Sequence, residues 1–163
     1  MMTVSEAIEK MAGGCGGSQY DVNHFLKVWA YAKTIGELEG LDERTQSVLE
    51  YAAIVHDIAC PSLREIHGNA PGKLQEEAGP PLARKFYEDS GLDTEIVDRV
   101  CWLVGHHHTL TEVDGLDHRI LLEADFLVNA GEGEASHETI DRYRENVFRT
   151  ESGLRLLDTV YPE

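Results

Sequence analysis

YAAIVHDIA, residues 51–59, places a histidine and an aspartate side by side within an apolar stretch that has helical character. A buried carboxylate is costly unless it is paired, hydrogen-bonded or bound to a metal. His56 and Asp57 therefore need a partner in the interior of the protein. A divalent metal ion would satisfy both side chains at once, and a buried hydrogen-bonded pair of the two residues is the simpler alternative.

Upstream of this stretch, two helices are predicted. His24 begins an apolar stripe with helical spacing, so the first of these helices turns His24 inward. Asp42 can cap the second helix, which carries His56 on its apolar face. Pro61 should end that helix, because proline cannot continue the hydrogen-bonded backbone.

Downstream, two further segments bring polar residues to apolar faces. An amphipathic helix delivers the triplet His106–His108 at its C-terminal end, where the helix dipole favours cations. The alternative for this triplet is an exposed cluster without a catalytic role. Residues 117–130 form a strongly apolar helix in which Asp125 shares a face with Leu121.

The remaining segments predict shorter helices and one long loop. Thr3 and Glu6 have the spacing of a capping box for an N-terminal helix that a run of glycines ends. Residues 62–81 are poorly periodic and rich in glycine and proline, so we predict a long loop with at most one helical turn. Residues 82–90 form a short helix, and Ser136 can cap one last helix.

These segments together predict an all-α fold. No segment alternates apolar and polar residues with a period of two, so no sheet is expected. A chain of 163 residues suits a single domain. We therefore predict one helical bundle of about six or seven helices. Residues 1–20 form an N-terminal helix and a glycine-rich loop, residues 21–130 the core with the candidate site, and residues 131–163 a C-terminal helix.

The composition excludes several classes of function. The chain has 14 Lys and Arg against 30 Asp and Glu, a formal charge of -16, which would repel the phosphate backbone of a nucleic-acid polymer. Its cysteines, Cys15, Cys60 and Cys101, are widely spaced and form no CxxC pair, which favours a reducing compartment. Residues 1–10 lack the apolar core of a signal peptide, and no apolar run approaches the roughly 20 residues needed to cross a bilayer. We expect a cytoplasmic protein with no membrane partner.

The inward polar residues form a mixed set of nitrogen and oxygen ligands, which suits a borderline or hard divalent metal. In chain order they are His24, the pair His56 and Asp57, the histidine triplet and Asp125. This order resembles the HD-domain superfamily of metal-dependent phosphohydrolases. The resemblance covers about residues 21–130 and rests on four elements. They are His24 with Lys27 and Val28, Ala53-Ile54-Val55-His56-Asp57-Ile58, the histidine triplet, and Leu122-Glu123-Ala124-Asp125.

The resemblance implies a metal centre and an activity. His24, His56, Asp57 and Asp125 match the metal ligands of the family, which implies about one divalent ion per chain. Mn, Fe, Ni, Co, Zn and Mg are all candidates for that ion. The implied substrate is a small phosphate ester, nucleotides included, hydrolysed by a metal-activated water.

Four residues match catalytic positions of the family. Asp57 would hold the metal and also orient the attacking water. Lys27, one helical turn after His24, would bind a phosphate oxygen, although a solvated lysine is the alternative. His107 or His108 would contact the substrate or protonate the leaving group.

Two departures from the family pattern bear on these expectations. The branches with two metals usually carry a further histidine at the start of the helix after the long loop, where this chain has Gln75-Glu76-Glu77-Ala78-Gly79. Glutamate could replace that histidine as a ligand, but a single ion is the simpler interpretation. The nucleotide-cleaving branches often have an acidic residue where this chain has Cys60, which argues against a nucleotidase.

The oligomeric state is open, and a homo-oligomer is one alternative. Two other functions also stay open. One is a di-iron oxygenase of the same fold that acts on a small polar substrate. Its additional ligands would come from His67, Glu76, His106 or His107. The other is a non-catalytic module with a structural metal.

Overall fold

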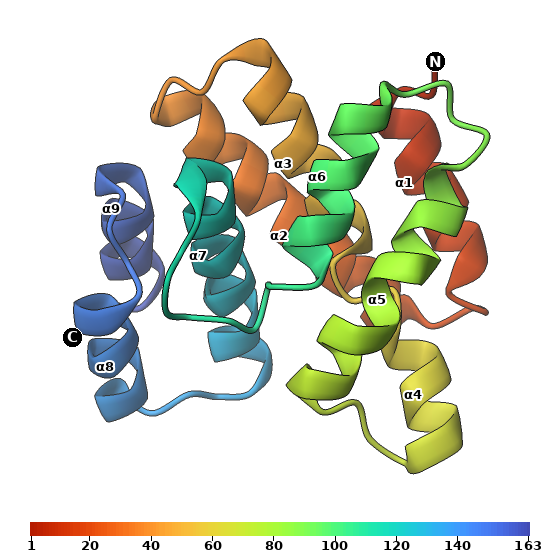
Figure 1. Ribbon diagram of the computed structural model, residues 1–163. Coiled ribbons are helices and arrows are strands. Elements are labelled where there is room, and N and C mark those ends of the chain that lie inside the picture. The colour runs from red at the N-terminus through yellow and green to blue at the C-terminus, as the bar shows by residue number, and fades with distance from the viewer.

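The computed structural model describes all 163 residues, and they form nine helices and no strand (Figure 1). The helices are α1 (Val4–Gly14), α2 (Gln19–Leu38), α3 (Glu43–Val55), α4 (Cys60–His67), α5 (Gly72–Tyr87), α6 (Thr94–Val104), α7 (Gly115–Glu132), α8 (His137–Asn146) and α9 (Glu151–Val160). The predicted all-α class is confirmed. The number of helices is higher than the six or seven predicted.

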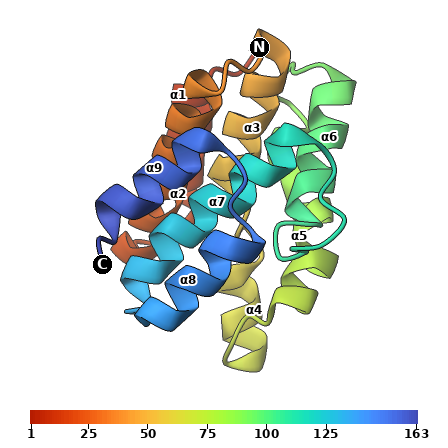
Figure 2. The same cartoon turned by 90° about the vertical axis from the view of Figure 1, so that its left-hand side faces the viewer.

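Helices α2, α3 and α7 form the centre of the molecule. α2 packs against both α3 and α7, and α3 also packs against α6. Figure 2 shows α8 and α9 on the outer side of α7, away from α5 and α6. One continuous hydrophobic core joins these helices, with fully buried side chains such as Val28, Ile54 and Leu121. Polar side chains on the three central helices therefore face one another in the interior.

Several predicted helix starts are confirmed by their caps. The hydroxyl of Thr3 accepts from the backbone N–H of Glu6, and the Glu6 carboxylate accepts from the N–H of Thr3. The side chains of Asp42 and Ser136 accept from backbone N–H groups in the first turns of α3 and α8. These bonds satisfy donors that a helix start otherwise leaves free.

The prediction that Pro61 ends the helix carrying His56 is wrong. α3 already ends at Val55, and residues 56–59 form a turn. Pro61 instead lies in the first turn of α4, where backbone N–H groups have no acceptor within the helix. The N–H that proline lacks is therefore not needed there. The early end of α3 places His56 and Asp57 at a helix C-terminus.

The predicted loop over residues 62–81 is also wrong, because α4 and α5 occupy most of it. The predicted helix over residues 82–90 is the second half of α5. Close packing against α6 explains why glycine and proline are accommodated here. A Cβ at Gly79 would lie 2.6 Å from a methyl group of Val104, and Pro80 packs against Gly105.

The C-terminal part contains two helices where one was predicted. The backbone turns between α8 and α9 at Arg149 and Thr150. The buried carboxylate of Glu123 on α7 accepts from the N–H groups of both residues and from the Thr150 hydroxyl. No helix of the protein has both the length and the apolar character needed to cross a membrane.

Candidate metal centre

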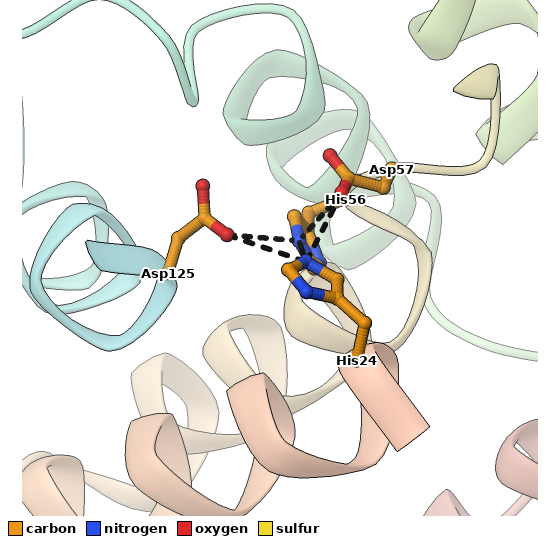
Figure 3. A group of neighbouring side chains, drawn as sticks. All are labelled: His24, His56, Asp57 and Asp125. Atoms are coloured by element: carbon orange, nitrogen blue, oxygen red, sulfur yellow. Dashed lines mark hydrogen bonds and ion pairs between the residues drawn. The ribbon is translucent and has the colours of Figure 1, made fainter. Parts of the chain in front are cut away.

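Four side chains from α2, α7 and the turn after α3 converge in the interior (Figure 3). They are His24, His56, Asp57 and Asp125, which are the four predicted metal ligands. One potential ligand atom from each lies within 4.8 Å of the others. His24, His56 and Asp125 are buried. We refer to these four residues as the His-Asp cluster.

The imidazole Nε2 atoms form the middle of the His-Asp cluster. Nε2 of His24 lies 3.1 Å from Nε2 of His56 and 3.1 Å from Oδ2 of Asp57. Nε2 of His56 lies 3.4 Å from the same Asp57 oxygen. Oδ1 of Asp125 lies 3.5 Å from Nε2 of His24 and 3.3 Å from Nε2 of His56. Two nitrogens and two carboxylate oxygens therefore point at one small volume.

The other ring nitrogen of each histidine is held by a hydrogen bond. Nδ1 of His56 donates to the carbonyl of Ala53 over 2.7 Å. Nδ1 of His24 donates to Oε2 of Glu132 over 2.9 Å. Such bonds fix the orientation of metal-binding histidines and leave Nε2 free to bind the metal.

When no metal is bound, protonated His24 and His56 supply the positive charge of the cluster. Burial disfavours a charged His24, but the carboxylates of Asp125 and Asp57 outweigh it and raise the pKa of His24 to about 9. The pKa of His56 is likewise well above its usual value, because Asp57 and Asp125 overcome the effect of burial. The pKa values of both carboxyl groups are lowered by the neighbouring imidazoles in spite of burial. The site thus favours positive charge at its centre.

Three observations show that these residues fit a divalent metal ion. Oδ1 of Asp125 is fully buried and has no hydrogen-bond partner. His56 and Asp57 follow the last turn of α3, where the helix dipole is negative. The set of two imidazoles and two carboxylates has the ligand types that Mn, Fe, Co, Ni and Zn accept. The cluster could therefore hold one ion through all four residues.

Sequence comparison agrees with this geometry. The profile of the HD-domain family matches residues 21–140, which include all four residues of the His-Asp cluster. The chain belongs to the HD-domain family.

Two known proteins are similar to this HD domain. A crystal structure from an uncultured Thermotogales bacterium, described as a predicted HD superfamily hydrolase, superposes with a TM-score of 0.68. It is 22% identical, and the match covers 96% of this chain and 84% of that chain. The bifunctional uridylyltransferase/uridylyl-removing enzyme of Cupriavidus pinatubonensis is 36% identical over 66 residues. That match spans 40% of this chain and only 7% of the enzyme.

A second histidine group adjoins the His-Asp cluster of the HD domain. His107 is buried, and its Nε2 lies 3.0 Å from Oδ1 of Asp57. Nε2 of His108 donates to Oε1 of Gln75 over 2.7 Å, and Nε2 of His107 lies 3.3 Å from the same oxygen. Asp57, His107 and His108 also lie close enough together to hold an ion. Asp57 thus belongs to both groups.

His108 differs from the other histidines of the site in its charge. Its ring packs against Gly72 and His107, although part of the residue is exposed. Burial of the ring and the neighbouring His107 lower the pKa of His108 to about 4. His108 is therefore neutral at pH 7.

The structure places the other predicted residues outside the His-Asp cluster. Nζ of Lys27 lies 3.3 Å from Oε1 of Glu132, the carboxylate that also holds His24. His106 stacks on Trp102, and Glu76 accepts from the backbone N–H of His108. His67 is exposed at the end of α4. The phosphate contact predicted for Lys27 stays a prediction.

One residue of the site was missed in the sequence, and a second was placed in the wrong element. Glu132 lies seven residues after Asp125, two helical turns further along the same face of α7, and this spacing is the signal that could have identified it. Gln75 was assigned to the loop that proved to be α5. No local pattern in the sequence points to its contact with the histidines.

Two cavities adjoin the His-Asp cluster, and Asn129 lines both. The first, of about 310 Å³, we call the α7–α8 cavity. Its polar lining includes His107, His108, Asp125, Asn129, Thr139 and Arg142. The second, of about 380 Å³, is lined by residues that include His24, Asp57, Arg64 and Gln75. Residues of the candidate metal centre are therefore reachable from two sides by small molecules.

Proposed function

We propose that this HD domain is a metal-dependent phosphohydrolase that acts on a small phosphate ester. The observation that carries the proposal is the His-Asp cluster, in which a buried Asp125 oxygen accepts no hydrogen bond, next to two cavities of small-molecule size. The partners we propose are small molecules. The net charge of -16 disfavours a nucleic-acid polymer.

Four protein ligands would leave part of the coordination shell of a six-coordinate ion to substrate and water. A bound divalent ion would orient the phosphate and lower the pKa of a water molecule. His24 and His56 would hold the ion through Nε2, with Asp57 and Asp125 supplying carboxylate oxygens. The Nδ1 bonds to Ala53 and Glu132 keep both rings in that orientation.

The neighbouring residues position the reacting groups. Nε2 of His107 lies beside Oδ1 of Asp57, so His107 restricts the carboxylate that would orient the attacking water. His108 has a pKa of about 4, and a neutral ring donates one hydrogen bond and accepts another at pH 7. We therefore propose substrate contact, rather than leaving-group protonation, for His108.

The similar proteins support hydrolysis without naming a substrate. The structural neighbour is described as a hydrolase, and the partial match includes a uridylyl-removing activity in its name. The first name gives the predicted reaction class as hydrolysis, and the second gives the removal of a uridylyl group. Neither name identifies the substrate of this HD domain.

The test combines metal content with activity. Freshly purified protein is analysed by elemental mass spectrometry, beside Asp125→Asn and the exposed control Asp89→Asn. We expect about one divalent ion per chain in the wild type and the control, and none in Asp125→Asn. A panel of phosphate esters should be hydrolysed only by the two metal-bearing proteins. Equal hydrolysis by Asp125→Asn would refute the proposal.

One observation favours a second candidate function. Asp57, His107 and His108 could hold another ion beside the first, as a di-iron oxygenase would require. Two irons per chain and oxygen consumption with a small polar substrate would identify that function. A metal that stays bound without any exchangeable water would instead indicate a structural, non-catalytic module.

A further inference from the structure

Arg142 on α8 differs from every other arginine of the chain. Of the nine arginines, six pair with carboxylates and two donate to backbone carbonyls. The guanidinium of Arg142 makes neither an ion pair nor a hydrogen bond. In a chain with 30 acidic residues, an arginine with neither a carboxylate partner nor a backbone acceptor is unusual. Arg142 therefore has all its donors available for a ligand.

This free guanidinium lines the α7–α8 cavity together with Asp125 of the His-Asp cluster. The remaining wall is mixed: Leu110, Leu122, Phe126 and Ala130 form an apolar part of it, beside polar residues such as Asn129 and Thr139. A ligand in this cavity would contact a metal ligand, the apolar part of the wall and an arginine. This combination suits an organic phosphate rather than inorganic phosphate alone.

The backbone beside Arg142 is held firmly against α7. The ring of Tyr143 stacks on the ring of Phe126, with their centroids 3.8 Å apart and their planes 10° from parallel. The side-chain amide of Asn146 donates to the carbonyl of Arg142. The backbone of Arg142 is thus held in place, while its guanidinium stays free to bind a ligand.

We propose that Arg142 determines specificity by binding a second anionic group of the substrate. This inference rests on the proposed function. The substrate class is then a small phosphate ester that also carries a carboxylate or a further phosphate. The phosphate to be cleaved belongs at the His-Asp cluster, where a bound divalent ion would attract it. A guanidinium binds planar or tetrahedral anions through two parallel hydrogen bonds, so it would select esters with such a group.

The test uses ligands that cannot be hydrolysed, so it does not depend on catalysis. Binding to the manganese-loaded protein is measured by calorimetry for phosphonoacetate, 3-phosphonopropanoate and 4-phosphonobutanoate. Alkyl phosphonates of equal chain length serve as the matched ligands without a carboxylate. The proteins are the wild type, Arg142→Gln, Arg142→Lys and the control Arg155→Gln, which removes an exposed guanidinium on α9.

We expect the carboxylate to tighten binding by about tenfold or more for at least one chain length in the wild type and in Arg155→Gln. Arg142→Gln should lose this gain and bind the alkyl phosphonates as the wild type does. Arg142→Lys should keep part of the gain. No gain in the wild type at any length, or a gain that survives in Arg142→Gln, would overturn the inference.

Failure of the proposed function has a different signature. If the wild type hydrolyses no phosphate ester, the phosphohydrolase proposal fails, and the carboxylate gain at Arg142 can still be measured. If phosphate esters are hydrolysed but the gain is absent, only the role of Arg142 fails. Thermal unfolding of the variants checks that the exposed Arg142 substitutions leave the fold unchanged.

Discussion

His24 shows most directly how single residues define the site. Its two ring nitrogens have different partners, with Glu132 on one side and the His-Asp cluster on the other. The carboxylates raise its pKa from 6.5 to about 9, so His24 is an imidazolium at neutral pH when no metal is bound. Folding of the metal-free protein is therefore linked to proton binding at this residue.

This linkage predicts a loss of stability at alkaline pH. Because the pKa is raised in the folded state, its stabilising effect is complete below pH 6.5 and is lost as the pH rises through about 9. We expect the free energy of unfolding of the metal-free protein to fall by ~3 kcal/mol over that interval, measured by urea titration in the presence of a chelator. His24→Asn should flatten this dependence. An unchanged slope in that variant would contradict the assignment.

The convergence of four side chains in the interior was predictable from the sequence, whereas their binding of a metal stays a prediction. His24, His56, Asp57 and Asp125 could be identified because each is a polar residue within an apolar helical pattern. Gln75 and Arg142 could not, because their roles depend on which side chains other helices bring near them. An exposed arginine on a helix looks the same in the sequence whether it pairs with a carboxylate or lines a cavity.

Among the helices, α5 differs most from its prediction. Glycine and proline signals indicated a loop, yet Gln75, Ala83 and Tyr87 bury one face of a helix. Packing between α5 and α6 overrides the local preference, and Gly79 permits their close approach. Local sequence patterns contain no information about a neighbouring helix at that distance.

The α5–α6 contact can be tested at Gly79. Gly79→Ala adds a Cβ that would lie 2.6 Å from the buried Val104, so we expect a loss of ~1–3 kcal/mol in the free energy of unfolding. Gly13→Ala is the matched control, because Gly13 is exposed in α1 and has open space around it. The control should be neutral or stabilising by up to ~1 kcal/mol. Equal effects of the two substitutions in urea unfolding would contradict this account.

The junction of α7 with α9 depends on one buried carboxylate. Glu123 is completely buried and accepts three hydrogen bonds from Arg149 and Thr150. Glu123→Ala would leave these donors without partners, and we expect the free energy of unfolding to fall by ~2–4 kcal/mol. Glu123→Gln should cost less, because its carbonyl oxygen can still accept. Denaturant unfolding of both variants measures the difference, and a fully stable Glu123→Ala would refute this role.

At the scale of the whole molecule, charge opposes folding. The net charge of -16 is spread over a chain whose surface ion pairs, such as Arg44 with Glu95, are largely exposed. Exposed pairs contribute only ~0–1 kcal/mol each, so repulsion among the excess carboxylates should dominate the effect of salt. The fold class itself was predictable, because helical periodicity is a local signal.

We therefore expect salt to stabilise the protein. Raising sodium chloride from about 0.02 to about 0.3 M shortens the range of the repulsion, and the melting temperature should rise by about 2–4 °C. The metal-loaded protein at a fixed, saturating metal concentration is the sample for this measurement. A lower melting temperature in salt would mean that the ion pairs outweigh the repulsion.

The contact of Gln75 with His107 and His108 has an evolutionary consequence. Its amide oxygen lies between the two rings, next to the group that could hold another ion. Every glutamine codon becomes a histidine codon by one base change. A lineage with this fold can therefore acquire a third imidazole at that point in a single mutational step. Members with one metal and members with two would then be neighbours in sequence space, separated by one substitution on α5.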